Sequence, residues 1–207
     1  MAEIVNIVTQ GGQSTCGTEI VYRVGLSRVV AQVRELDSGT GRFVEFASFE
    51  PNEVSELPVV YAEKRAADDT QYRVVIAEGV TSWQVVQALN SLEFMAGNVA
   101  DIHLEGTLAP DSYQVQPGNS VAELLVVMKS AQVRILAEAW AQRAEGLPLS
   151  SPQEALILAS IIEKEASTSD ERFEVASVFV NRLNLGMRLQ TDPTVIYGVT
   201  EGRGVLG

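Results

Sequence analysis

The strongest constraint on the fold is a run of helical periodicity from about Pro152 to Ala166, which ends in the acidic triplet at 163–165. Ser150 or Ser151 can cap this helix, and a proline is accepted in its first turn. Three apolar residues and Glu165 recur at the i, i+3, i+4 and i+7 positions, the apolar ones being Leu158, Ile161 and Ile162. We therefore expect a helix whose apolar stripe faces a core.

The two acidic residues of the triplet point in different directions. Each residue of a helix advances by about 100°, so Glu163 is rotated by roughly 200° from Glu165. Glu165 ends the apolar stripe, where partial burial would disfavour its charged form, as a general acid requires. Glu163 shares its face with smaller residues and can pair with Lys164 or an arginine in solvent. The alternative is that the triplet is only the charged end of an ordinary helix.

A second amphipathic helix is expected over residues 171–187, with Gly186 as its stop. The following segment, 188–198, is polar, and because Asp192 precedes a proline we expect this segment to be extended. Five side chains of these two segments offer hydrogen-bonding groups or a ring of the kind that holds sugars: Asn181, Gln190, Thr191, Asp192 and Tyr197.

Three stretches, LASIIEKE, ASVFVNRL and GMRLQTDPTVIYG, give residues 155–198 a specific resemblance. They resemble the signature block of the endolytic murein transglycosylases, YceG-like bacterial enzymes that cut the glycan strands of peptidoglycan. LEGTLAPDSY at 104–113 resembles another element of that family, although a simple turn is the alternative for it. The resemblance implies that one carboxylate of the triplet is the catalytic acid. Together with the helix-face argument it favours Glu165, with Glu163 as the secondary acid, and it adds Glu105 to the substrate-binding residues.

The reaction that the resemblance implies is a lyase reaction at the bond between N-acetylmuramic acid and N-acetylglucosamine. Glu165 would protonate the glycosidic oxygen and then, as a carboxylate, take the proton of the muramic acid 6-hydroxyl, whose attack forms a 1,6-anhydro end. A hydrolase instead needs a second carboxylate. The alternative function is a non-catalytic peptidoglycan-binding or scaffold fragment of the cell-wall machinery.

Composition argues against several other classes of protein. A formal net charge of −12 is unsuited to nucleic-acid binding, which needs clustered Lys and Arg. One cysteine, Cys16, and one histidine, His103, allow neither an intrachain disulfide nor a zinc constellation, so no metal or other cofactor is expected. Cys16 is expected to be a structural or incidental thiol. No run of about 20 apolar residues predicts a membrane span in this chain.

The resemblance also implies a cellular setting. Relatives in the family usually carry one N-terminal anchor, which places the parent protein at the bacterial inner membrane, facing the periplasm. Glycan strands are then the substrate, and cell-wall synthases are implied as partners. Because no anchor is visible and the signature block lies close to Gly207, we expect a chain that is truncated at both ends and cleaves glycan poorly.

The expected fold class is α+β, with small LysM-like strand-helix modules followed by a mainly helical catalytic region. Residues 1–70 should contain the remnant of an upstream module, a β-rich segment and a linker. Residues 71–102 should form a LysM-like module, in which Thr81 caps the helix. Residues 103–207 should form the catalytic region, which we expect to be incomplete at its C-terminus.

Finer expectations concern single segments. Residues 2–12 should be a short helix, residues 19–33 and 41–49 a hairpin around the turn at 37–41, and residues 50–70 a linker. The order of strand, Gly turn and Ser-capped helix recurs at 112–128, which suggests a short internal repeat. One helical stripe is expected in the core, and Trp83 with it: Leu124, Leu125, Met128, Val133, Leu136 and Trp140.

Overall fold

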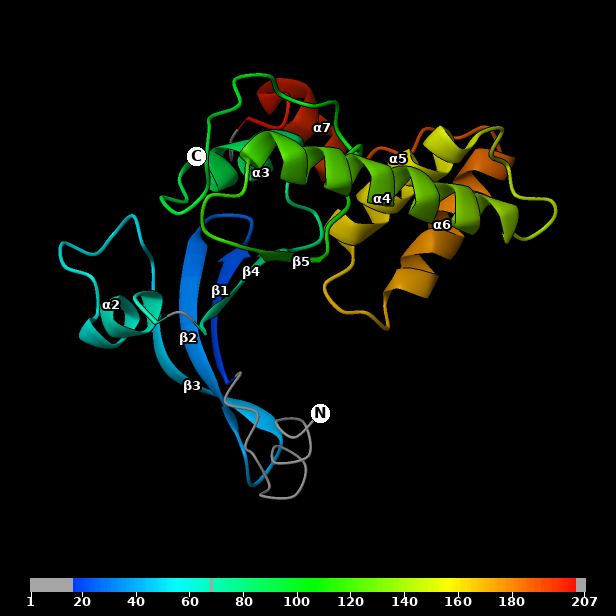
Figure 1. Cartoon of the computed structure of the whole chain (residues 1–207). Helices are drawn as coiled ribbons and strands as arrows, with labels where there is room; N and C mark the ends of the chain where they lie inside the picture. The colour runs from blue at the N-terminus through cyan, green and yellow to red at the C-terminus, as the bar shows by residue number, and fades with distance from the viewer. Residues whose placement is uncertain (1–16, 68, 204–207) are drawn as a thin grey trace, which may run out of the picture. The chain divides into compact units, whose positions relative to one another are not determined.

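The computed structural model describes residues 17–67 and 69–203 and shows an α+β chain that divides into two compact units (Figure 1). We call them the sheet unit, residues 17–67, 69–77 and 111–119, and the helical unit, residues 78–110 and 120–203. The expected helix at 2–12 and the thiol of Cys16 lie outside the described residues.

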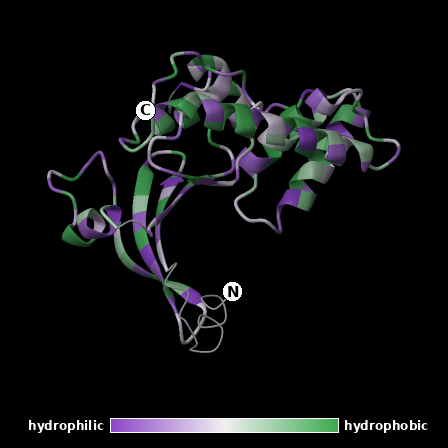
Figure 2. Ribbon diagram, in the orientation of Figure 1, coloured by the Kyte–Doolittle hydropathy of each residue, from purple (hydrophilic) through white to green (hydrophobic). Residues whose placement is uncertain are grey.

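The sheet unit is built on five strands, β1 Thr18–Val24, β2 Val29–Asp37, β3 Arg42–Phe49, β4 Gln71–Ile76 and β5 Ser112–Val115. Their order is β3-β2-β1-β4-β5. β1 and β4 are parallel, with Ile20 opposite Tyr72, and the other neighbours are antiparallel. Successive side chains point to opposite faces, so β4 buries Tyr72, Val74 and Ile76. Figure 2 shows the resulting mixture of green and purple segments along the strands.

The expected hairpin at 37–41 is confirmed, because β2 and β3 pair around a turn in which the amide of Gly41 donates to the carbonyl of Asp37 at 2.8 Å. The run at 19–33 is two strands and not one. The chain reverses at residues 25–28, where the amide of Gly25 donates to the carbonyl of Arg28 at 2.9 Å. A tight turn flanked by apolar residues on both sides leaves the alternation nearly unbroken, which is why the sequence pattern hides it.

The expected linker at 50–70 contains a helix, α2 Val59–Arg65. Its Tyr61 is buried and packs edge-to-face on Phe49, with the ring centroids 4.9 Å apart. The hydroxyl of Tyr61 also shares a hydrogen bond of 2.5 Å with the hydroxyl of Tyr22 on β1. This one aromatic side chain fixes a short and otherwise charged helix in the sheet unit.

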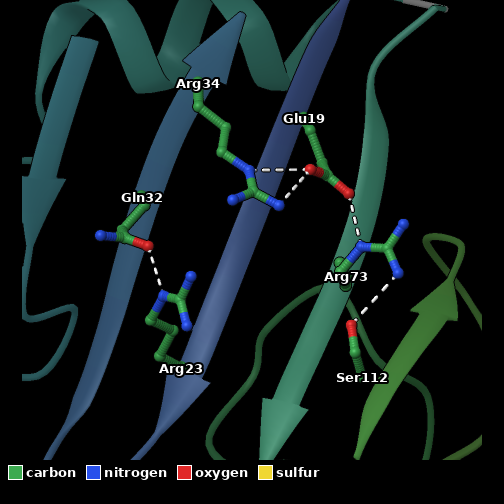
Figure 3. A network of polar contacts seen from close by, with 6 residues as sticks. All are labelled: Glu19, Arg23, Gln32, Arg34, Arg73 and Ser112. Atoms are coloured by element: carbon green, nitrogen blue, oxygen red, sulfur yellow. Dashed lines mark hydrogen bonds and ion pairs between the residues drawn. The ribbon is translucent and has the colours of Figure 1, made fainter. Parts of the chain in front are cut away.

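A buried carboxylate ties three strands of the sheet together (Figure 3). The Glu19 side chain, 4% exposed, accepts from Arg34 Nε at 2.8 Å and Arg73 Nε at 2.6 Å, and Arg73 also donates to Ser112 at 3.1 Å. Burial alone would raise the pKa of Glu19, but the hydrogen bonds and charges of Arg73 and Arg34 outweigh it and hold this pKa below its ordinary value. Glu19 is buried and both of its oxygens are paired, so we interpret it as the centre of a structural ion-pair network.

The helical unit contains α3 Ser82–Asn90, α4 Val121–Ala141, α5 Pro152–Glu165, α6 Arg172–Asn184 and α7 Asp192–Thr200 (Figure 1). α5 contacts α4, α6 and α7. Its buried Leu158 and Ile161 meet Phe179 of α6 in a small core. Partly buried apolar residues surround it: Leu149, Ile162, Val175, Val180, Leu183 and Leu189. The stripe predicted for α5 is therefore confirmed as a core stripe.

The starts of α3 and α4 lie where they were predicted, whereas the apolar stripe predicted for α4 is buried only in its first half. Thr81 caps α3 through a full capping box with Gln84. α4 begins after Ser120, although that side chain makes no capping bond. Leu124, Leu125 and Met128 are buried, whereas Val133 is 65% exposed and Trp140 is only partly buried, so the core role ends before the second half of α4. Trp83 on α3 is also only partly buried.

The strand at 71–76 and the helix at 82–90 follow the order expected for residues 71–102. The strand belongs to the sheet unit and the helix to the helical unit. The assignment of 71–102 as a LysM-like module stays a prediction.

The segment at 188–198 is not extended throughout, because α7 begins at Asp192. Pro193 lies in the first turn, where its missing N–H costs no helical hydrogen bond. From the sequence alone this proline argues against a helix, but it lies in the first turn of a new helix. Upstream, α6 ends near Gly186 at a φ of 64°, as predicted.

Candidate functional site around the acidic triplet

α5 carries the triplet at its C-terminal end, and its boundaries follow from local chemistry. Ser151 accepts the amide of Glu154 at 3.2 Å, and Pro152 occupies the first turn. The helix ends at Glu165, and Ala166 is extended. The last helical hydrogen bond runs from the amide of Ala166 to the carbonyl of Ile162 at 2.9 Å. The triplet thus lies in the final turn, where backbone bonding is least complete.

The three charged side chains of the triplet reach three different parts of the helical unit, because each residue of a helix advances by about 100°. Glu163 forms an ion pair with Arg172 of α6 at 2.9 Å. Glu165 accepts a hydrogen bond from the hydroxyl of Thr191, at the start of α7. Lys164 lies against the Gly79 turn: a Cβ atom added at Gly79 would be 3.3 Å from its Nζ atom.

The predicted surroundings of the two acids are confirmed for Glu163 and wrong for Glu165, while their roles stay a prediction. Glu163 pairs with an arginine, as its position on the helix predicted. Glu165 was expected to be partly buried, but it is exposed. Helical periodicity gives the direction of a side chain, and the core on this face ends at Ile161, with Ile162 only partly buried. What fixes Glu165 is the hydroxyl of Thr191, a side chain that is itself 6% exposed.

The other predicted sugar-binding residues lie at different distances from this contact along the chain. Gln190, immediately before Thr191, has a φ of 49° and an exposed side chain, and Asp192 is exposed in the first turn of α7. Tyr197 lies one turn further on and is 49% exposed. Asn181 is exposed on α6. The structure therefore brings Thr191 to Glu165 directly, and leaves Asn181, Gln190 and Asp192 open to solvent.

Glu105 is held at the start of α3 by contacts that no local pattern predicts. Its two carboxylate oxygens accept the amide of Ser82, the first residue of α3, at 3.0 and 3.1 Å. Burial raises the pKa of Glu105, while the bond from Ser82 and the charge of Lys164 oppose that rise. A partly buried carboxyl with a perturbed pKa beside the triplet makes this region a candidate site.

Two further groups respond to Glu105. Burial lowers the pKa of Lys164, and the neighbouring charges of Glu163 and Glu105 raise it in part. Burial raises the pKa of Tyr197, with smaller contributions from Glu105 and Glu201 in the same direction. Lys164 was not among the predicted site residues, although its place between the two acids was a signal for it.

A cavity of about 440 Å³ lies beside the triplet, between α5 and α6. Its lining is largely apolar and includes the ion pair of Glu163 and Arg172. The aromatic ring of Phe173, 85% exposed, stands at its edge. Its lining residues are Glu78, Ala159, Ile162, Glu163, Arg172, Phe173 and Ala176. A largely apolar lining with an ion pair and an exposed aromatic ring is suited to a sugar ring.

Among residues 17–67 and 69–203, no group of three or more His, Cys, Asp or Glu side chains is placed to hold a metal ion. None of the helices described in these residues has the length and apolar character that crossing a membrane requires.

The end of α5 thus carries one acid that is held by a threonine and another that lies beside a hollow. The model of the YceG-like family matches residues 48–206, and the chain belongs to this family.

Two relatives carry the name endolytic murein transglycosylase. The chain is 36% identical to the protein of Bacillus subtilis strain 168 over 94 residues, which are 45% of this chain and 26% of that protein. It is 31% identical to the protein of Streptococcus pneumoniae strain D39 over 99 residues, which are 47% of this chain and 17% of that protein. The matched part of the chain thus spans about a quarter, or less, of the length of these curated relatives.

Proposed function

We propose that this chain carries the catalytic region of a peptidoglycan lytic transglycosylase, which cleaves the bond between N-acetylmuramic acid and N-acetylglucosamine within glycan strands. The observation that carries the proposal is the contact between Glu165 and Thr191, which holds one acid of the triplet in place while Arg172 occupies the other. Membership of the YceG-like family and the name of the two relatives support the choice of substrate.

In the proposed reaction, Glu165 acts first as an acid and then as a base. Its proton passes to the glycosidic oxygen as the bond from that oxygen to C1 of the muramic acid breaks. The carboxylate then takes the proton of the 6-hydroxyl as O6 forms its bond to C1, and the ring closes to a 1,6-anhydro end. No water is consumed, and Glu165 returns to its protonated form, so atoms and charge balance.

The pairing of Glu163 with Arg172 supports this lyase reaction better than hydrolysis. A hydrolase needs a second carboxylate to act as a nucleophile or to activate water. Glu163 is engaged by Arg172 and points away from Glu165. The 6-hydroxyl of the substrate replaces the missing nucleophile.

Because Glu165 is exposed in the free protein, we propose that the bound substrate itself shields this carboxyl from water. A glycan strand laid over the end of α5 would exclude water from this carboxyl, and desolvation disfavours its charged form. The general acid would then be completed only in the complex. Asn181, Gln190, Asp192 and Tyr197 are proposed to contact the acetamido sugars, with Thr191 acting through Glu165. The carboxylate of Glu105 is held by the amide of Ser82, so Glu105 is left out of this set.

The test is mass spectrometry of purified glycan strands after incubation with the protein. New 1,6-anhydro ends support the proposal. New reducing ends would mean hydrolysis, and intact strands in a pelleted complex would mean a peptidoglycan-binding or scaffold role. Either of the last two results contradicts the proposal.

The setting of the protein is proposed on the same family resemblance. We place the parent protein at the bacterial inner membrane through a single anchor, with this region facing the periplasm, and cell-wall synthases as its partners. Protease accessibility in spheroplasts and crosslinking in intact cells test these two points. A protected region, or crosslinks that leave out every synthase, would contradict them.

The internal organisation is proposed as a LysM-like module at 71–102 and a catalytic region at 103–207. If the first of these binds glycan, changing the exposed Gln87 of α3 to Glu should weaken pelleting with insoluble peptidoglycan. Pelleting equal to that of the wild type would count against the module.

A further inference from the structure

Two oppositely charged side chains converge on one short segment at the start of α3. The Nζ atom of Lys164 lies against Gly79, since a Cβ atom added there would be 3.3 Å from it. The carboxylate of Glu105 accepts the amide of Ser82 at 3.0 and 3.1 Å. The exposed Lys164 and the bonded Glu105 therefore approach the same stretch of backbone three residues apart.

The carboxylate of Glu105 is confined on its other side by the end of α7. A Cβ atom added at Gly202 would be 2.8 Å from Glu105 Oε1 and 3.3 Å from the ring of Tyr197. The hydroxyl of Thr81 holds this glycine by donating to its carbonyl at 2.7 Å. Glu105 thus sits in a close-fitting position that only glycine at 202 leaves open.

The loop that carries Glu105 is also packed on α5. A Cβ atom added at Gly106 would be 2.7 Å from a methyl carbon of Leu156, so backbone and side chain are in close contact there. The loop at 104–106 therefore contacts α5 at Leu156.

We propose that Glu105 is a positioning residue, which acts through Lys164 to fix the last turn of α5 and so to aim Glu165 at Thr191. The residues at 163–165 are consecutive, so a rotation of Lys164 about the helix axis would rotate both neighbouring acids. The carbonyl groups of the last turn have no helical partner, so the backbone resists that rotation less than it does in the middle of the helix. Side-chain contacts therefore help to fix its geometry.

The electrostatics of the cluster agree with this arrangement. Lys164 faces Glu163 on its own helix and Glu105 across from it, and both raise its pKa against the lowering effect of burial. Glu105 faces Lys164, whose charge lowers the pKa of Glu105 against the larger effect of burial, and it also faces Tyr197. Each charge thus responds to the other, although the two make no direct ion pair in the described contacts.

The first test uses the lysine content of the chain, which has only Lys64, Lys129 and Lys164. With ¹³C-labelled lysine, the three side chains give three NMR titrations. Glu105→Gln removes the charge and keeps an oxygen for the amide of Ser82. We expect the pKa of Lys164 to fall in this variant, while the other two lysines serve as internal references. An unchanged pKa of Lys164 would overturn the proposal.

The second test rests on the proposed function and uses the release of 1,6-anhydro ends. Glu105→Gln and Lys164→Met should each lower kcat by about tenfold with KM within about twofold, since a misplaced catalytic group costs rate and not binding. Lys164→Arg keeps the charge and should retain at least about half of kcat. Glu123→Gln, an exposed carboxylate on α4, is the matched control and should keep wild-type kcat.

The two tests separate the failure of this proposal from the failure of the proposed function. Wild-type kcat in Glu105→Gln, or equal losses in Lys164→Arg and Lys164→Met, would overturn the positioning role. If the wild-type chain releases no ends at all, the proposed function fails for this chain, and the titration of Lys164 alone decides whether the two charges are coupled.

Discussion

Replacing Thr191 by valine isolates the one contact that fixes Glu165. The two side chains have nearly the same shape, so the substitution removes a hydroxyl from a position that is 6% exposed. A hydrogen bond contributes about 0.5–1.5 kcal/mol, and we take the upper end because Thr191 is buried. If the bond is needed in the transition state, its loss of ~1.5 kcal/mol predicts about a tenfold fall in kcat.

The stability of the variant should change little. Thr191 is the N-cap residue of α7, but its side chain makes no capping bond, so valine does not uncap the helix. We expect a loss below about 1 kcal/mol, or about 2–4 °C in Tm. Thr191→Ser keeps the hydroxyl and should keep most of the activity. The reasoning is refuted if Thr191→Val releases 1,6-anhydro ends at the wild-type rate, or if the serine variant is as slow as the valine variant.

Two further predictions concern the scaffold. Glu19→Gln should destabilise the sheet unit by about 1–3 kcal/mol at pH 7, because two arginines lose a charged acceptor. Folding lowers the pKa of Glu19, so the stability that Glu19 contributes is present above pH 4.5 and fades as the pH falls below that value. The free energies of unfolding of the two proteins, measured by urea titration, should therefore converge in acid. A difference that stays constant with pH would contradict this. Gly106→Ala should cost ~1–3 kcal/mol more than Gly97→Ala. Both glycines have a positive φ, but only at position 106 does the new Cβ meet Leu156, so equal melting temperatures would contradict the packing described here.

Local signals predicted the parts of the fold that local chemistry decides. A serine cap, a proline in the first turn and a regular apolar stripe placed α5 correctly, and Thr81 placed the start of α3. α7 was missed because the proline after Asp192 was read as a helix breaker, although proline is also common in a first helical turn. That signal was present in the sequence and was given the wrong weight.

Long-range contacts decide what the sequence pattern left open. The parallel pairing of β1 with β4 joins segments about fifty residues apart, and alternation alone does not select a partner strand. The same holds in the candidate site. Periodicity predicted the direction of Glu165 but not its exposure. The contact of Glu105 with Ser82 joins a loop to the start of α3, more than twenty residues earlier in the chain, which no local pattern predicts.

The central claim is that Glu165, and not Glu163, transfers the proton during glycan cleavage. Glu165→Gln and Glu163→Gln should be compared on the same purified glycan strands, with 1,6-anhydro ends counted by mass spectrometry and folding checked by circular dichroism. Glutamine is nearly isosteric with glutamate but transfers no proton, so Glu165→Gln should fold and abolish cleavage. Glu163→Gln, which weakens only the pair with Arg172, should have a milder effect. Cleavage that survives in Glu165→Gln and is lost in Glu163→Gln would contradict the account and move the catalytic role to Glu163.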